Sequence, residues 1–343
     1  MTQSLLKHVR FAGVHASVPD QRFDNLNNPS SFTDEERRKF VDLTGVRERR
    51  IAPSSICSTD LCHDAARRLL AELDWPAETI DLLAFVTQTP DYFQPSNGAL
   101  AHRDLGLPLD CASFDITLGC SGYPYGLSVA AHMVAAGTAK RALVLHGETP
   151  TKVNHPDDRA TFLLFGDAGS ATALEFDESA GTCGFNLHSD GTGYDDLIVP
   201  GRGFRVEQPE NDRDRFLYMN GTNIFNFTLK RVPKLVRDGL ALMEWQTGDV
   251  DRFVFHQANL FMLKHLMKKL KVPAERAPLT IESFGNTGGV SVPLTMARHY
   301  LEQPPGAAER LMLLGFGIGL SWGAAMFEIG PEVAFGFSEL ASG

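Results

Sequence analysis

Apolar and polar positions alternate along the chain in blocks that predict successive strands and helices. In the first half, short and largely apolar runs predict strands at residues 9–19, 80–89, 111–117, 141–149 and 168–176. The stretches between them predict helices at 33–43, 58–73 and 121–136, the first two with Thr33 and Ser58 at their start. This alternation is typical of helices that cover a mostly parallel, buried sheet, so the predicted class is α/β.

The second half repeats this order of elements. It predicts a strand near 183–190, a helix near 221–245, a strand at 251–257, a helix at 259–271, a loop at 282–293, a helix to about 303, and two closing strands at 310–317 and 321–329. Residues 200–215 have no clear period and predict an exposed loop or covering segment. We therefore expect two similar halves, 1–178 and 179–343.

Composition narrows the classes of function. With 343 residues, 43% of them hydrophobic and 22% charged, the chain can bury a large core. Its net charge of -10 argues against nucleic-acid binding, which needs a surplus of Lys and Arg on one surface. No apolar run approaches the roughly 20 residues that cross a bilayer, and the amino terminus lacks the pattern of a secretory signal. We expect a soluble, cytoplasmic protein with no membrane partner.

The five cysteines are odd in number and form no C-x-x-C pair, which favours reduced thiols. Cys57, Cys62 and His63 could supply three zinc ligands, but no second pair of matching spacing accompanies them. We therefore expect no metal site. Four cysteines are interpreted as structural: Cys57, Cys62, Cys111 and Cys183.

Cys120 has a different setting from the other cysteines. It lies in DITLGCSGYPYG, where a predicted strand passes through a turn of small residues into a predicted helix. A helix amino terminus presents unpaired backbone N–H groups and positive potential, which would favour the thiolate and lower the pKa of Cys120. The same N–H groups could bind the oxygen of a reacting carbonyl. Cys120 is therefore the candidate nucleophile.

Two further polar residues stand where ligands could reach them. His256 ends the apolar run RFVFHQ, so its imidazole is expected at the carboxyl end of a strand, where ligands of α/β sheets collect. A lone histidine there is more often structural, but Gln257 and Asn259 strengthen the functional interpretation. Asn286 lies in FGNTGGVSVP, where its amide could face a cavity or support its own turn. None of the other ten histidines is expected in a comparable setting.

The segment GFGIGLSWG at 315–323 superficially matches a dinucleotide-binding glycine pattern. It stands between two predicted strands, and no helix follows it to receive a pyrophosphate, so no nucleotide cofactor is expected. Its glycines would instead let the backbone approach Cys120. The N–H groups of Ile318 and Cys120 would then point at the same carbonyl oxygen.

Together, these blocks resemble the ketoacyl-acyl-carrier-protein synthase III branch of the thiolase superfamily. The resemblance spans almost the whole chain, through LTGVRERRI (43–51), FDITLGCSGYPYGLSVA (114–130), DRATFLLFGDAGSATAL (158–174), HSDG (188–191), HQAN (256–259), GNTGGVSVP (285–293) and GFGIGLSWG. It implies a five-layered αβαβα thiolase-like fold of two related halves, usually a homodimer. The first half would carry the nucleophilic Cys, and the second the His and Asn.

By this resemblance, Cys120, His256 and Asn286 form a Cys-His-Asn triad. Cys120 would take an acyl group from an acyl-CoA or acyl-carrier-protein thioester. A malonyl thioester on acyl carrier protein would then lose carbon dioxide and condense to a 3-oxoacyl thioester. His256 and Asn286 would donate hydrogen bonds to the thioester oxygen of the enolate. The thioesters are substrates, and no cofactor is implied.

The resemblance also implies positions that bind substrate. Phe316 would make the site apolar and disfavour the malonyl carboxylate relative to released carbon dioxide. Gln94 stands where relatives often place an apolar residue that reaches across the dimer and closes the acyl pocket, so the pocket length stays open. Further oxyanion or substrate-binding residues are expected at Ile318, Asn259, Phe225 and Gly221.

Three positions depart from the pattern of the enzymes that start fatty-acid chains. Lys39 and Leu43 replace a Trp and an Arg that commonly hold the CoA nucleotide, and Phe261 replaces a basic residue. These departures favour a specialised fatty-acid or polyketide-type pathway and leave CoA and carrier protein open as donors. A cluster of lysines could meet an acidic carrier protein or form a solvated helix face: Lys264, Lys268, Lys269 and Lys271.

Two other functions stay open. In the first, the acyl group on Cys120 passes to an alcohol, amine or thiol without a new carbon–carbon bond. Asn286 speaks against this acyltransferase, because stabilising an enolate is what the Asn adds. The second is a non-catalytic partner subunit of an active homologue, which the intact triad disfavours.

Overall fold

The computed structural model of the chain describes residues 2–341. Its strands are β1 (Thr2–Leu6), β2 (Val9–Pro19), β3 (Arg22–Asp24), β4 (Glu48–Arg50), β5 (Leu82–Val86), β6 (Ala112–Ile116), β7 (Arg141–Glu148), β8 (Ala168–Phe176), β9 (Cys183–Ser189), β10 (Leu197–Ile198), β11 (Tyr218–Met219), β12 (Arg252–Phe255), β13 (Glu309–Gly317), β14 (Ser321–Ile329) and β15 (Ala334–Leu340). Its α-helices are α1 (Asp34–Thr44), α2 (Ser58–Glu72), α3 (Asn97–Leu105), α4 (Gly122–Ala135), α5 (Gly221–Met243), α6 (Leu260–Leu270), α7 (Ile281–Phe284) and α8 (Ser291–Glu302).

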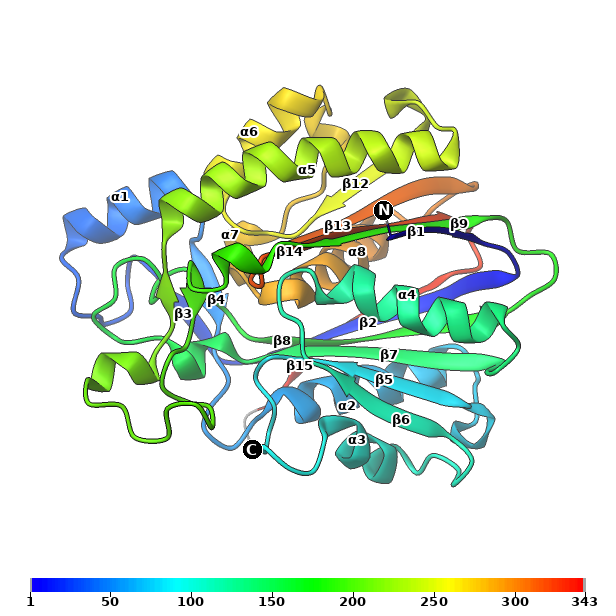
Figure 1. Ribbon diagram of the computed structural model, residues 1–343, viewed down its shortest axis with the longest axis horizontal. Coiled ribbons are helices and arrows are strands. Elements are labelled where there is room, and N and C mark those ends of the chain that lie inside the picture. Colours follow the sequence, from blue (N-terminus) through cyan, green and yellow to red (C-terminus); the bar gives the residue numbers. More distant parts are fainter. Residues whose placement is uncertain (1, 342–343) are drawn as a thin grey trace.

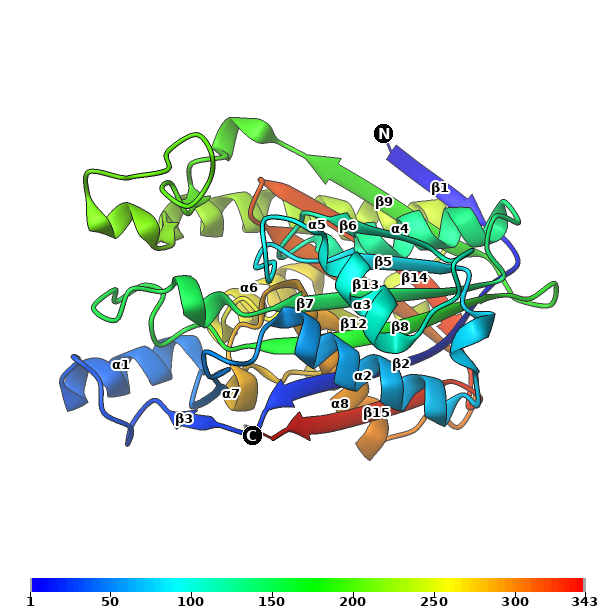
Figure 2. The ribbon, with the colours of Figure 1, turned by 90° about the horizontal axis from the view of Figure 1, so that it is seen from below.

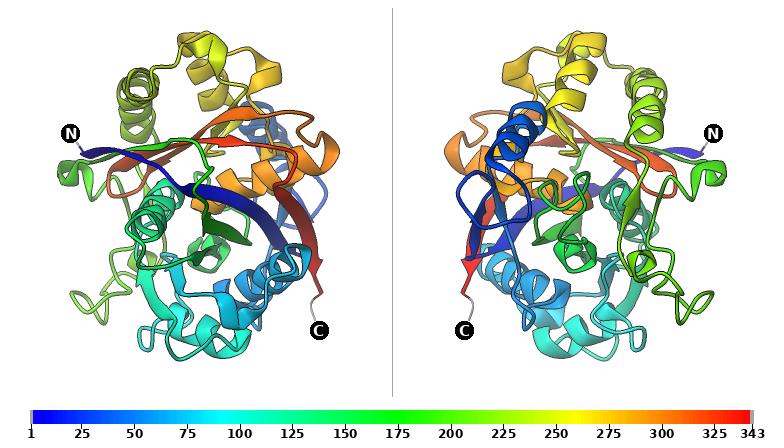
Figure 3. Two further views of the ribbon diagram at one scale, coloured as in Figure 1. Left: turned by 90° about the vertical axis from the view of Figure 1, so that its right-hand side faces the viewer. Right: turned by 90° about the vertical axis from the view of Figure 1, so that its left-hand side faces the viewer.

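Five layers of helices and sheets stack on one another. Helices α5 and α6 cover one face of a five-stranded sheet, and α4 and α8 lie between this sheet and a six-stranded one (Figures 1 and 3). Helices α2 and α3 cover the outer face of the six-stranded sheet. This order of layers confirms the predicted α/β class and αβαβα arrangement.

The two sheets exchange strands from the ends of the chain. Their strand orders are β1-β9-β14-β13-β12 and β15-β2-β8-β7-β5-β6. Strand β1 pairs with β9 of the second half, and β15 pairs with β2 at the edge seen in Figure 2. Each sheet thus holds one strand from the far end of the sequence. The division into 1–178 and 179–343 stays a prediction.

Local sequence explains where several elements begin and end. The Thr33 hydroxyl accepts a hydrogen bond from the N–H of Glu36, whose carboxylate accepts from the N–H of Thr33. This capping box starts α1, and Gly45 ends the helix in the left-handed conformation. Helix α4 consists mostly of small and apolar residues because it is buried between the two sheets.

Most predicted elements are confirmed, and β2 and β8 have the predicted limits. The extent of the 282–293 loop was wrong, because α7 extends to Phe284 and α8 already begins at Ser291. The two predicted closing strands are confirmed as β13 and β14, but β15, which follows them, was not predicted. Strand β1 and helix α3 were not predicted. Within residues 2–341, no helix has both the length and the apolar character that a membrane crossing requires.

Candidate active site

Cys120 lies on the turn between β6 and α4. Strand β6 ends at Ile116, Ser121 is the N-cap residue of α4, and the helix begins at Gly122. The nucleophile predicted from sequence therefore stands directly before the N-cap, at the amino end of the central helix layer. Its side chain is buried, with 8% of its surface exposed.

Strand β13 approaches Cys120 closely because glycines occupy two of its positions. A Cβ atom at Gly315 would lie 2.8 Å from the carbonyl oxygen of Cys120, and one at Gly317 would lie 2.9 Å from its Sγ. Such contacts are shorter than real side chains make, so only glycine fits. The backbone N–H groups of Ile318 and Cys120 both act on the Cys120 sulfur and lower the pKa of its thiol. The two N–H groups predicted to form an oxyanion hole therefore meet at the nucleophile.

Burial dominates the acidity of Cys120. It raises the pKa of the thiol to about 11, because the thiolate loses its solvation in the protein interior. The N–H groups of Ile318 and Cys120 lower this pKa, and the nearby Glu148 carboxylate raises it. The predicted lowering of the pKa is therefore wrong, and Cys120 rests as a thiol at neutral pH.

His256 follows directly on β12, as predicted. Its Nδ1 lies 2.9 Å from the carbonyl oxygen of Gly288 and 2.9 Å from Oγ of Ser291. Burial lowers the pKa of the imidazole to about 4, so the ring is neutral at pH 7. The Phe316 ring meets it edge to face, with 5.4 Å between centroids. These contacts hold the ring in place and leave Nε2 for a ligand.

Asn286 follows α7 by two residues. Its backbone N–H donates to the carbonyl oxygen of Leu164 at 2.9 Å, and its Oδ1 accepts from the N–H of Gly288 at 3.0 Å. Its Nδ2 lies 3.4 Å from the carbonyl oxygen of Ala258. Because Nδ2 carries two hydrogens, one remains for a ligand. The amide thus supports its own turn and also borders a cavity, so both interpretations of Asn286 hold.

Two cavities meet at Cys120. The small cavity, of about 70 Å³, is lined by Cys120, His256 and Asn286 together. The large cavity, of about 540 Å³, is lined by Cys120 but by neither of the other two. The structure thus brings the predicted triad together and places its nucleophile where the two cavities join.

The other predicted substrate-binding residues divide into two groups. Phe316, Asn259 and Gly221 line the small cavity, and Ile318 lines the large one. Two residues line neither cavity. Phe225 stacks on Phe261 of α6 with 5.5 Å between centroids, and Gln94 is exposed.

Comparison with known proteins decides the family. Residues 114–191 match 3-oxoacyl-[acyl-carrier-protein] synthase III, and residues 240–329 match the C-terminal part of that family. A beta-ketoacyl-[acyl-carrier-protein] synthase III from Alkalilimnicola ehrlichii is 33% identical over 326 residues, which cover 94% of this chain and 99% of the relative. The chain belongs to the 3-oxoacyl-acyl-carrier-protein synthase III family.

Solved structures of synthase III enzymes agree with this fold. A 3-oxoacyl-(acyl-carrier protein) synthase from Burkholderia xenovorans LB400 matches with a TM-score of 0.94 and 40% identity over 98% of both chains. The priming beta-ketosynthase of the R1128 polyketide pathway matches with a TM-score of 0.86 and 27% identity, over 95% of this chain and 97% of that one. The predicted family and its thiolase-like fold are confirmed.

Sequence reasoning missed two ionisable residues of this synthase III, both near the end of β7. Glu148 lines the large cavity, and its carboxyl accepts hydrogen bonds from the Gln88 N–H and the Thr89 hydroxyl. Burial raises the pKa of Glu148 to about 8. His146 is fully buried, which lowers its pKa to about 3, and its Nε2 lies 3.9 Å from Glu148. His146 lines neither cavity at Cys120, so it does not share the setting of His256. In the sequence, the polar residues of HGE (146–148) at the carboxyl end of an apolar strand could have indicated these two residues.

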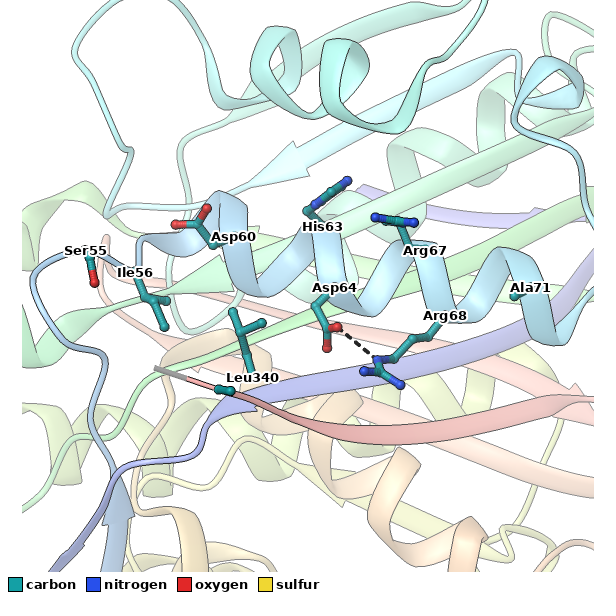
Figure 4. Close-up of a pocket in the computed structure, with 10 residues that line it drawn as sticks. Ser55, Ile56, Asp60, His63, Asp64, Arg67, Arg68, Ala71 and Leu340 are labelled. Carbon is teal, nitrogen blue, oxygen red and sulfur yellow. Dashed lines mark hydrogen bonds and ion pairs between the residues drawn. The ribbon is translucent and has the colours of Figure 1, made fainter. Parts of the chain in front are cut away.

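A separate hollow of about 630 Å³ lies away from the triad along α2 and the end of β15 (Figure 4). Several of its charged side chains contact each other or the backbone. Asp64 pairs with Arg68 at 2.9 Å, and the His63 ring lies 3.0 Å from the carbonyl oxygen of Asp104. The hollow contains no nucleophile beside a base, and we assign it no catalytic part.

The remaining cysteines are free thiols. Cys62, Cys111 and Cys183 are buried, whereas Cys57 is half-buried and lines the large cavity. Across residues 2–341, no three His, Cys, Asp or Glu side chains gather as metal ligands would. Cys57 is thus the second thiol that a ligand in the large cavity could meet.

Proposed function

We propose that this synthase III accepts an acyl group on Cys120 and condenses it with a malonyl thioester on acyl carrier protein, with loss of carbon dioxide. The observation that carries this proposal is the meeting of Cys120, His256 and Asn286 at one small cavity. The product is a 3-oxoacyl thioester. Both substrates bring their own activated thioester, so the chemistry needs no cofactor.

In the first half-reaction, the Cys120 sulfur attacks the donor thioester carbonyl. The new carbon–sulfur bond forms as the bond to the donor sulfur breaks, and the proton lost by Cys120 ends on the released thiol. The N–H groups of Ile318 and Cys120 stabilise the tetrahedral oxyanion. Because the thiol pKa is about 11, the proton must leave during attack. The neutral His256 ring borders the same cavity and can accept it.

In the second half-reaction, the malonyl group breaks its bond to the carboxylate and releases carbon dioxide. The electron pair left behind forms an enolate, which attacks the acyl carbon on Cys120. Asn286 donates Nδ2–H to the enolate oxygen. His256 donates as well after its Nε2 has taken a proton from solvent, which it returns to solvent when the product leaves. The apolar Phe316 ring beside His256 disfavours the carboxylate. Cys120 leaves as a thiolate and regains a proton from solvent.

We propose acyl carrier protein as the partner that presents the thioesters. Asn259 lines the small cavity and is also the N-cap of α6. The helix that starts there exposes a lysine cluster suited to an acidic protein: Lys264, Lys268, Lys269 and Lys271. Leu43 and Phe261 are 58% and 42% exposed, and neither can bind a phosphate group. This supports a carrier protein rather than CoA as donor, in a specialised fatty-acid or polyketide-type pathway.

We also propose a homodimer. Strand β6 lies at one edge of the six-stranded sheet and pairs only with β5 in the described part of the chain. An edge strand can pair with its own copy across a twofold axis. Size-exclusion chromatography with light scattering tests this assembly, and a monomeric mass would contradict it.

Intact-protein mass spectrometry tests the reaction. Acyl thioesters on CoA, pantetheine and carrier protein are offered to the wild type, to Cys120→Ala and to Cys57→Ala, the matched thiol in the large cavity. We expect one acyl mass on the wild type and Cys57→Ala alone, discharged as a 3-oxoacyl product when malonyl-carrier protein is added. Acylation that persists in Cys120→Ala would refute the proposal. An acyl mass that malonyl thioester leaves unchanged would favour acyl transfer to another acceptor.

A further inference from the structure

The large cavity beside Cys120 has mostly apolar walls. Aliphatic and aromatic side chains line it beyond the nucleophile, among them Phe165, Leu197, Val199 and Leu217. These side chains come from the loop before β8 and from the β10–β11 region. A ligand that extends from the Cys120 sulfur therefore meets hydrocarbon for most of its length.

The charged groups that line the cavity are already satisfied by the protein. Glu148 accepts two hydrogen bonds, and its raised pKa of about 8 leaves it mostly neutral at pH 7. Lys152 donates to the carbonyl oxygen of Ile56 at 2.6 Å. Asp91 accepts from the Ser58 hydroxyl at 3.2 Å. A polar substituent on the ligand would therefore have to compete with these existing hydrogen bonds.

Gln88 is an uncharged polar residue at the start of the cavity, and its side chain differs from these charged groups in lacking a partner within residues 2–341. A Cβ atom at Gly119, the residue before Cys120, would lie 2.4 Å from the Gln88 Oε1. Within the described residues, the Gln88 side-chain amide has no hydrogen-bond partner. This polar group can contact only the first atoms of an acyl group on Cys120, and the apolar walls begin beyond it.

The size of the cavity sets the length of the group that fills it. Its volume is about 540 Å³. If a methylene group takes up roughly the volume of one water molecule, about 30 Å³, and the chain fills about half of the open space, about eight to ten carbons fit. A two-carbon acetyl group would leave most of this apolar space to water.

The outer rim of the cavity continues the apolar surface. Phe93, which lines the cavity, contacts Phe204 of the 200–215 segment with 5.6 Å between ring centroids. The two side chains are 73% and 79% exposed. This aromatic pair joins two loops that are far apart in sequence and extends the wall that the end of a long chain would touch.

We propose that the acyl group carried by Cys120 is an unsubstituted aliphatic chain of medium length, roughly eight to ten carbons, rather than acetyl. This inference rests on the proposed self-acylation of Cys120. Val199 in the wall and Phe93 at the rim select for chain length. Each additional methylene that enters the cavity strengthens binding until the chain reaches the rim.

Single-turnover acylation measured by intact mass spectrometry tests the inference, with a series of straight-chain acyl-pantetheine thioesters from acetyl to dodecanoyl. We expect octanoyl and decanoyl transfer to exceed acetyl transfer by at least roughly tenfold. Val199→Trp should remove this preference and keep acetyl transfer. Its matched control is Ile198→Trp, at the neighbouring residue that lines neither cavity, which should behave as the wild type. Phe93→Ala, at an exposed position, should lower decanoyl transfer severalfold without slowing acetyl transfer.

The outcomes separate this inference from the proposed function. Acylation of Cys120 at equal rates along the series, or fastest with acetyl, would overturn the chain-length inference and leave self-acylation intact. A preference for longer chains that Val199→Trp leaves unchanged would also overturn it. No acylation by any thioester would refute the proposed function itself.

Discussion

The Nδ1 atom of His256 lies 2.9 Å from the carbonyl oxygen of Gly288. A carbonyl oxygen can only accept a hydrogen bond, so Nδ1 carries the hydrogen of the neutral ring and Nε2 is left as an acceptor. Neutral His256 can therefore take a proton from Cys120, but it cannot donate to an enolate oxygen. The geometry assigns His256 first to proton transfer and only afterwards to hydrogen-bond donation.

We expect His256 to stay neutral, with its hydrogen on Nδ1, as pH falls from 8 to about 5. Burial lowers the pKa of the imidazole to about 4, so protonation begins only as the pH approaches that value. Side-chain ¹⁵N spectra of histidine-labelled protein check this, with His256→Gln used to assign the signals. A hydrogen on Nε2, or a titration midpoint near 6.5, would contradict the assignment.

Cys120 should react slowly with iodoacetamide at neutral pH. Because its pKa is raised to about 11, the thiolate fraction and the alkylation rate should rise about tenfold per pH unit between about pH 7 and 10. Peptide mass spectrometry resolves Cys120 from Cys57. A plateau below pH 8 would show a preformed thiolate.

The same experiment measures the influence of Glu148. Its carboxyl ionises near pH 8, and its negative charge raises the pKa of Cys120. In Glu148→Gln this charge is missing, so alkylation of Cys120 above pH 8 should be faster than in the wild type. Rates that coincide with the wild type throughout would show that Glu148 does not act on the thiol.

Two substitutions separate the two roles of Asn286, in which Oδ1 supports the turn and Nδ2 donates to the enolate oxygen. Asn286→Asp keeps an oxygen that accepts from the Gly288 N–H, whereas Asn286→Ala removes both the acceptor and the Nδ2 donor. We expect both variants to lose condensation by about 10²–10³-fold, because each lacks the donor to the enolate oxygen. Acylation of Cys120 should continue in both. Condensation that survives in Asn286→Asp alone would assign the residue to its turn.

Local signals in the sequence predicted much of this fold and site. Strands β2 and β8 are largely apolar runs with clear limits, so their predicted ends match the structure. Cys120 and His256 stand at junctions between elements, which a pattern of strands and helices reveals. Helix α7 is only four residues long, too short to show a helical period, so it was interpreted as loop.

Properties that arise from distant contacts could not be predicted in this way. The sequence around Cys120 shows a helix start, but the burial that raises its pKa comes partly from Gly315 and Gly317, almost 200 residues later. His146 looked like part of an ordinary buried strand, and only the fold brings it beside Glu148. The junctions between predicted elements therefore located the reactive residues. The pKa values of these residues depend on packing between distant parts of the chain.

Gly317 should be indispensable for acylation. A Cβ atom there would lie 2.7 Å from the Cβ and 2.9 Å from the Sγ of Cys120, at a φ of 153°. Gly317→Ala must therefore displace either the thiol or the neighbouring Ile318 N–H, and a misplacement of about 1 Å can cost about 10²-fold in rate.

Gly221→Ala is the matched control. It lines the same small cavity, but its Cβ would meet no atom within 4 Å. We expect Gly221→Ala to acylate within about threefold of the wild type, since alanine is also the better helix former. Thermal unfolding shows whether both variants are folded, and single-turnover mass spectrometry gives the rates. If folded Gly317→Ala acylated as fast as Gly221→Ala, the close approach of β13 to Cys120 would not be needed for the reaction.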